Sequence, residues 1–159
     1  MIQMVVTQCI VVAQPYASLI AFGYKRWEFR SYESKKTGHI GIAASNSVPW
    51  PTRNLELNKT SYLFPRGVVL ATADLVASFF VTSEDLKRKL TGPVQINLHG
   101  HIIVTCGEPI GEPLEDVNGA IADRNWNSFA WLLENVKPLE NPIPFERNDR
   151  STWVTVDIP

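Results

Sequence analysis

Hydrophobic residues in this chain gather in short blocks rich in Val and Ile, a pattern typical of buried β-strands. Four hydrophobic blocks stand out, at residues 4–13, 39–45, 67–81 and 129–139, and the last of them is rich in Leu and aromatic residues instead. The block at 67–81 is the strongest strand signal, and we expect it to bend near Asp74. The strand at 129–139 is expected to end at the proline-rich ENPIPFE. A weaker strand or hairpin pattern covers 93–106, and STWVTVDIP predicts a last strand.

Two or three short helices are expected beside these strands. Apolar residues spaced i, i+3, i+4 and i+7 follow Pro15, which the first helical turn tolerates, and Gly23 is a natural stop for this two-turn helix. A second helix is predicted at 83–90, with Ser83 as N-cap, acids early and bases late. Residues 46–66 read as a long loop with room for a short helix, and 107–125 read as a loop.

The segment YKRWEFRSY, residues 24–32, crowds charges among aromatic residues. A regular strand from residue 27 would place Trp27 and Phe29 on the core face, and Glu28 and Arg30 on the other. The strand that follows, HIGIAAS, contains small residues that leave room for another group to approach closely.

Six or seven strands with two or three short helices predict a β-rich α+β domain, built as a small, partly open barrel with helices at its ends. A chain of 159 residues is expected to form a single domain, 1–159, and 45% hydrophobic with 19% charged residues is a globular composition.

Charge and cysteine content narrow the functional classes. Residues 1–53 carry four more bases than acids, whereas residues 108–159 carry six more acids than bases. The chain lacks the excess of basic residues typical of a protein that coats nucleic acid, so binding to a polyanion would need a local basic patch in the first third.

Cys9 and Cys106 are too few and too far apart in sequence to form a disulfide framework. Free buried thiols are favoured, and one cross-link between them remains possible.

No apolar stretch reaches the length of about 18–20 residues needed to span a membrane. The apolar N-terminal block has no Lys or Arg before Lys25, so we interpret it as a core strand instead of a signal peptide. A cytoplasmic protein without a membrane association is therefore expected.

Several segments resemble the ASCH domain family of the PUA-like superfamily. They are QPYASLI, then Gly23, Lys25, Glu28 and Arg30 in a Gly-x-Lys-x-x-Glu-x-Arg spacing, then HIGIAAS, RGVVLATADLV and FAWLLENVKPLENPIP. These segments follow one another in the family's order over about residues 10–145. The resemblance implies a PUA-like β-barrel, in agreement with the strand pattern.

The resemblance also implies a cleft for RNA or a nucleotide-like ligand. Carried onto this chain, the cleft residues are Lys25, Glu28 and Arg30, with Gln14 nearby and Ser45 at the end of the adjoining strand. The family is mixed: it includes RNA-binding or coactivator modules, proposed nucleases, and a branch that deacylates N4-acetylcytidine with a Lys-x-x-Thr arrangement. Here Glu28 occupies the place of that threonine, so direct transfer of the hydrolase activity is not implied.

The chemistry of these side chains permits more than one role. Lys25 and Arg30 would neutralise the negative charge of a ligand or bind it through paired hydrogen bonds. Glu28 would fix the orientation of the ligand, and Gln14 and Ser45 would supply neutral hydrogen bonds. The alternative for the Glu28–Arg30 pair is a surface ion pair. If the protein is an enzyme, Lys25 and Glu28 are the candidate catalytic residues.

Aromatic residues in polar loops are candidates for stacking on bases, and Trp50 and Trp126 fit that description, whereas Trp27 is expected in the core. The pair at His99 and His101 lacks further ligands beyond Cys106, so neither a metal site nor a cofactor is expected.

The function predicted from the sequence is binding of RNA or a nucleotide-like small molecule, in RNA metabolism or transcription coactivation. Two alternatives stay open. One is a hydrolase on an acylated or modified nucleoside, or a nuclease, using the same cleft. The other is a protein–protein module that uses its acidic C-terminal third. The oligomeric state is not indicated.

Overall fold

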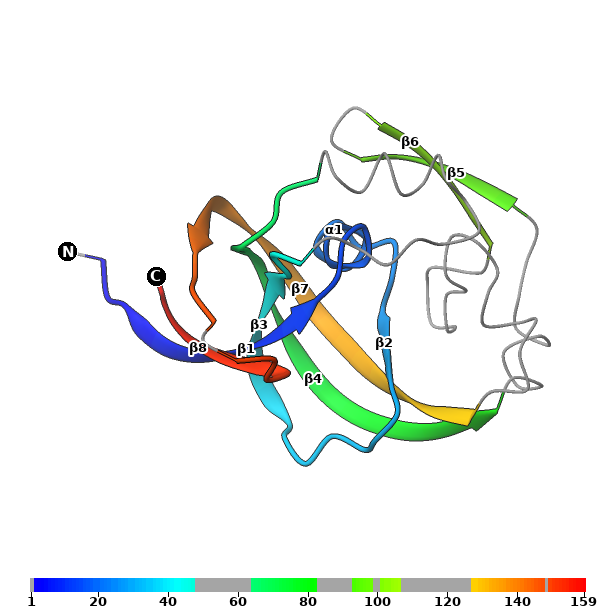
Figure 1. Ribbon diagram of the computed structural model, residues 1–159, viewed down its shortest axis with the longest axis horizontal. Coiled ribbons are helices and arrows are strands. Elements are labelled where there is room, and N and C mark those ends of the chain that lie inside the picture. The colour runs from blue at the N-terminus through cyan, green and yellow to red at the C-terminus, as the bar shows by residue number, and fades with distance from the viewer. Residues whose placement is uncertain (1, 48–63, 83–92, 99–100, 107–126, 148) are drawn as a thin grey trace.

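The computed structural model describes residues 2–47, 64–82, 93–98, 101–106, 127–147 and 149–159. Over these residues the main unit is one six-stranded sheet in the order β2-β7-β4-β3-β1-β8 (Figure 1). Its strands are β1 (Val5–Val12), β2 (Trp27–Arg30), β3 (Gly38–Ala44), β4 (Val68–Thr82), β7 (Asn127–Pro144) and β8 (Trp153–Ile158). The sheet does not close, so the prediction of a β-rich, partly open barrel is confirmed.

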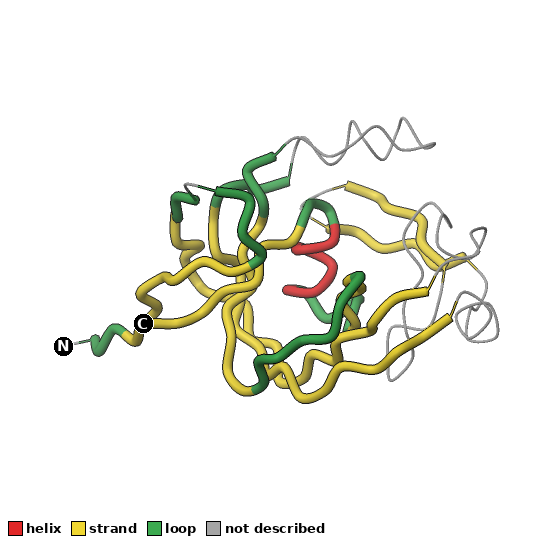
Figure 2. The backbone as a smooth tube through the Cα atoms, turned by 60° about the horizontal axis from the view of Figure 1, so that its bottom comes forward, coloured by secondary structure: helices red, strands yellow, loops and turns green. Residues whose placement is uncertain are grey.

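The helix α1 (Tyr16–Ala21) lies inside the curve of this sheet, with the strands around it (Figures 1 and 2). Leu19 and Ile20 are fully buried, and Ile20 belongs to the same core cluster as Trp131, the largest buried side chain. The helix ends at Gly23, whose φ of +82° suits glycine. The N–H of Gly23 bonds to Ile20 O and that of Tyr24 to Leu19 O, which is the Schellman pattern. The predicted short helix and its glycine stop are confirmed.

The long strands β4 and β7 bend together along one side of the barrel (Figure 1). Their register shifts at three points, between Val69 and Ala71, between Thr72 and Asp74, and between Leu75 and Ala77. An extra residue in one strand bends it and increases its twist. The predicted bend near Asp74 is therefore confirmed as a run of bulges.

The expectation that the prolines of ENPIPFE end β7 is wrong, because the strand continues to Pro144. Strand β2 pairs with β7 from Phe129 to Leu132, and beyond that point β4 is the strand that pairs with β7 among the described residues. A proline is tolerated on such an edge because no partner needs its missing N–H.

The predicted faces of β2 are also wrong. Glu28 lies opposite Trp131 in the antiparallel register, and directly opposite residues share a face. Trp131 is fully buried on the side of α1, so Glu28 is buried there as well, and Arg30 lies over the Trp131 ring. Trp27 is only half-buried on the other face, so its expected place in the core is not found.

The remaining predicted elements divide into two groups. The hairpin is confirmed as β5 (Pro93–Leu98) paired with β6 (His101–Cys106), and the last strand is confirmed as β8. The predicted helix at 83–90, the loop at 107–125 and most of the loop at 46–66 lie outside the described residues. Where the structure describes the chain, no helix is long and apolar enough to cross a membrane.

Candidate ligand-binding site

A pocket of about 320 Å³ opens where β1, β2 and β3 meet α1. Strands β1 and β3 run parallel and end together at Val12 and Ala44, and Ser45 N–H then bonds to Val12 O at 2.8 Å. This ties Ser45 to the end of β1, across from β2. The pocket, here called the Glu28 pocket, is lined by Val11, Val12, Ala13, Tyr16, Glu28, Phe29, Arg30, Ser45 and Arg147.

Glu28 and Arg30 form the polar wall of the Glu28 pocket. Arg30 Nη2 donates to Val11 O at 2.7 Å, and Arg30 Nε lies 3.2 Å from Glu28 Oε1. The ion pair is therefore shielded, with side chains 20% and 11% exposed, instead of lying on a solvated face. Glu28 Oε2 is buried and has no hydrogen-bond partner among the described residues. A buried acceptor left in this state is rare and is often completed by a ligand or water.

Lys25 is buried, with 5% of the residue exposed, and it is not among the residues that line the Glu28 pocket. Its ammonium lies 4.6 Å from the centroid of the Phe29 ring and 5.9 Å from that of Tyr16. Tyr16 and Phe29 are both among the residues that line the Glu28 pocket, so the Lys25 ammonium lies close to two aromatic residues of its wall.

Gln14 and Ser45 differ in how their side chains are used. The amide of Gln14 is buried; its Nε2 donates to Ser18 Oγ and Pro65 O, and its Oε1 accepts from Ser18 N. Gln14 thus holds the start of α1, which carries Tyr16. Ser45 lines the Glu28 pocket, and its Oγ accepts a hydrogen bond from Ser47 N at 3.1 Å.

The structure therefore brings Glu28, Arg30 and Ser45 together in one pocket. Lys25 lies beside the aromatic rings of Tyr16 and Phe29, and Gln14 is bonded to the start of α1. Trp50 and Trp126 lie outside the described residues, as do His99 and the side chains of His101 and Cys106. Within the described ranges, no group of three or more His, Cys, Asp or Glu side chains gathers as a metal site.

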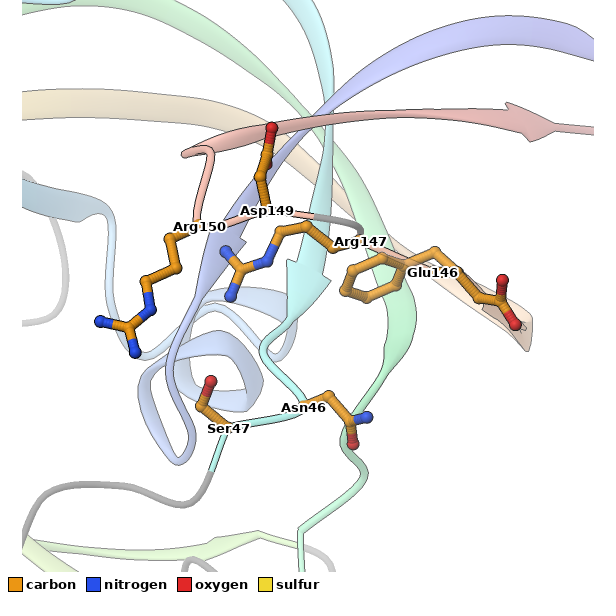
Figure 3. Close-up of a pocket in the computed structure, with 7 residues that line it drawn as sticks. Asn46, Ser47, Glu146, Arg147, Asp149 and Arg150 are labelled. Carbon is orange, nitrogen blue, oxygen red and sulfur yellow. The ribbon is translucent and has the colours of Figure 1, made fainter.

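The C-terminal segment adds residues that the sequence reasoning missed. Arg147, from the segment that follows β7, lines the Glu28 pocket and also a neighbouring pocket of about 520 Å³. This second pocket, here called the Arg150 pocket, is lined by Asn46, Ser47, Phe145, Glu146, Arg147, Asp149 and Arg150 (Figure 3). The two arginines close together in FERNDR could have indicated a local basic patch. They were overlooked because the last third of the chain is acidic overall.

Two titratable groups elsewhere in the sheet, Asp74 and Cys9, have shifted pKa values. The amide of Asn135 donates to Asp74 Oδ2 at 2.9 Å, and this bond, together with one from His39, lowers the pKa of Asp74. Burial raises the pKa of the Cys9 thiol to about 11, opposed by a backbone hydrogen bond with Gly41. Neither group touches the Glu28 pocket. Cys9 is a free, buried thiol, as predicted.

Comparison with known proteins gives two findings. The model of the family described as the ASCH domain matches residues 10–143. Human activating signal cointegrator 1 is 35% identical over 79 residues, and the mouse protein of the same name is 34% identical over 79 residues. Each match covers 43% of this chain but only 14% of the relative, so the chain corresponds to a small part of those proteins.

Proposed function

Because the chain belongs to the ASCH domain family, we propose that it binds RNA or a nucleotide-like molecule by holding one base in the Glu28 pocket. The observation that carries this proposal is the buried Glu28 Oε2, which has no hydrogen-bond partner among the described residues. A carboxylate oxygen only accepts hydrogen bonds, so the ligand must bring a donor. An exocyclic amine or a ring N–H of a base is such a donor.

The setting of Glu28 supports recognition of an amine. Arg30 engages the other oxygen, Oε1, and is itself anchored on Val11 O. Arg30 thereby positions the carboxylate, while rotation about the last bond of Glu28 is soft enough for Oε2 to turn toward a donor. A charged hydrogen bond of this kind is worth about 1.5–3 kcal/mol.

Tyr16 and Phe29 are among the residues that line the same pocket, and an aromatic ring offers an apolar surface against which a base can stack. Ser45 adds a hydroxyl, and Lys25 adds positive charge beside the rings. Gln14 contributes indirectly by holding the turn that presents Tyr16. Stacking by Trp50 and Trp126 stays a prediction from the sequence.

Binding is favoured over catalysis by the composition of the pocket. Glu28 is the carboxylate among its described lining residues, and it is paired with Arg30. A hydrolase would need in addition a base to activate a nucleophile such as the Ser45 hydroxyl, and the described lining residues include no second carboxylate and no histidine. The similarity to proteins named activating signal cointegrator 1 supports transcription coactivation or RNA metabolism as the setting of this binding.

The test measures binding and turnover in the same samples. Cytidine, N4-acetylcytidine and a short single-stranded RNA are titrated against wild type, Glu28→Gln and Tyr16→Leu, and the products are analysed by chromatography. Glu28→Gln is expected to weaken binding about 10- to 100-fold, because about 1.4 kcal/mol corresponds to a factor of ten. Tyr16→Leu keeps the Glu28–Arg30 pair and is expected to lose the stacking contribution, about 1–3 kcal/mol per base.

Glu33→Gln is the matched control, because Glu33 is exposed in the loop between β2 and β3. Thermal unfolding of each variant separates loss of binding from loss of folding. Product formation that disappears in Glu28→Gln would replace the binding proposal with the hydrolase alternative. Absence of binding to all three probes by a folded wild type would refute the proposal and favour the protein–protein alternative.

A further inference from the structure

We propose that the Arg150 pocket is a phosphate subsite that continues the Glu28 pocket, so that the ligand is a nucleotide or an RNA chain and not a free nucleoside. This inference rests on the proposed function. It assigns a role to Arg147 and Arg150, which lie in the acidic third of the chain.

The walls of the Arg150 pocket are held by the main sheet. One wall is Asn46 and Ser47, soon after β3, and the other consists of Phe145, Glu146, Arg147, Asp149 and Arg150, soon after β7. Gly67 connects them, because its N–H bonds to Ala44 O at 2.9 Å and its carbonyl accepts from Phe145 N at 3.1 Å. The two walls are therefore fixed relative to each other by backbone hydrogen bonds.

The positively and negatively charged side chains of the Arg150 pocket point in different directions. In Figure 3 the Arg150 side chain extends toward Ser47, and the Arg147 guanidinium lies on the same side of its segment. The carboxylates of Glu146 and Asp149 point away from both arginines (Figure 3). The pocket is therefore basic even though the residues that line it include two acids.

Local hydrogen bonds shape the turn that carries the two arginines. Arg147 Nη1 donates to Ser151 O at 2.9 Å, and Ser151 N–H donates to Asp149 Oδ1 at 2.8 Å. Asp149 is thus used to stabilise the turn, and Arg147 is held with the rest of its guanidinium still able to donate. Arg150 is exposed at the mouth, where it can reach a ligand.

Arg147 links the two pockets because it lines both of them. An anion in the Arg150 pocket therefore lies next to a base in the Glu28 pocket, as a phosphate lies next to its own base. Guanidinium groups bind phosphate oxygens through paired N–H donors. The Ser47 hydroxyl, which also lines the pocket, is a neutral donor of the kind that commonly completes such a contact.

The experiment compares ligands that differ only in the phosphate. Isothermal titration calorimetry is run with cytidine, cytidine 5′-monophosphate and cytidine 3′-monophosphate on wild type, Arg150→Gln and Lys35→Gln. Lys35→Gln removes the same charge from the exposed loop before β3, at the opposite end of that strand from Ser47. One of the two monophosphates is expected to bind wild type about tenfold or more tightly than cytidine, since a charged hydrogen bond contributes about 1.5–3 kcal/mol.

Arg150→Gln is expected to reduce the ratio of nucleotide to nucleoside affinity by about tenfold, while Lys35→Gln leaves the ratio as in wild type. With a short RNA, Arg150→Gln is also expected to lower the salt-dependence slope by about one. If cytidine and both monophosphates bind equally, or if Arg150→Gln leaves the ratio unchanged, the phosphate subsite is refuted and the base pocket stands. If none of the three binds, the proposed function and this inference fall together.

Discussion

The substitution Gly41→Ala tests how closely β1 and β3 approach beside the site. Small residues in HIGIAAS were expected to leave room for another group, and the structure identifies that group as the Cys9 side chain of the neighbouring strand. A Cβ on residue 41 would overlap Cys9 Sγ and lie 3.2 Å from both Cys9 Cβ and Ile158 Cδ1. Cys9 and Ile158 are 0% and 2% exposed, so neither has solvent to move into.

Overpacking of a buried site costs about 1–3 kcal/mol, and we expect about 2 kcal/mol for Gly41→Ala. For a chain of this size that corresponds to a fall of about 4–8 °C in Tm. Cys9→Ala removes the overlapping sulfur, and alone it should cost about 1 kcal/mol in lost apolar burial. In the double variant the new methyl fills the space left by Sγ, so the double variant should be about as stable as Cys9→Ala.

The assay is urea unfolding of wild type, both single variants and the double variant, read as a double-mutant cycle. The double variant is expected to be about 2 kcal/mol more stable than the sum of the two single effects would predict, which is the coupling free energy between the two sites. Additive effects, within about 0.5 kcal/mol, would show that Gly41 is not packed against Cys9 and would refute the reasoning.

Two further predictions concern pH. The folded-state pKa of Asp74 is lowered by hydrogen bonds from Asn135 and His39. The ionised carboxylate therefore stabilises the fold above the unfolded pKa of about 3.9, and this stabilisation is lost as pH falls through the folded pKa. In urea unfolding at a series of pH values, Asp74→Asn should make the free energy of unfolding fall less steeply below pH 4, and an unchanged slope would contradict this. The folded-state pKa of Cys9 is raised to about 11, so its stabilisation is complete below about pH 8.5 and is lost as pH rises toward 11. Between these values wild type should lose up to about 1.4 kcal/mol per pH unit relative to Cys9→Ala, and parallel curves for the two proteins would exclude the shift.

The secondary structure was largely predictable because its signals are local. Blocks rich in Val and Ile marked β1, β3 and β4, and the helical spacing that ends at Gly23 marked α1. Period and turn chemistry act over a few neighbouring residues, so they can be read before any tertiary contact is known.

Predictions failed where a partner strand decided the outcome. The period of two in β2 placed Glu28 and Phe29 on opposite faces correctly, but the identity of the buried face depended on pairing with Trp131, about a hundred residues later. Likewise, the prolines after residue 137 would end a central strand. They do not end β7, because in the described part of the chain no strand pairs with that side of β7 beyond β2.

The sequence by itself determined the strands, the short helix, the family and the residue types of the site, with Glu28, Arg30 and Ser45 named in advance. Tertiary structure alone decided that Glu28 is buried, that Lys25 is buried beside the Phe29 ring, and that Arg147 belongs to the same pocket as Glu28. The last of these depends on antiparallel pairing of β8 with β1, which brings the C-terminal segment back across the chain. Residue type and spacing carry no information about contacts between segments more than a hundred residues apart, because those contacts are set by strand register and core packing.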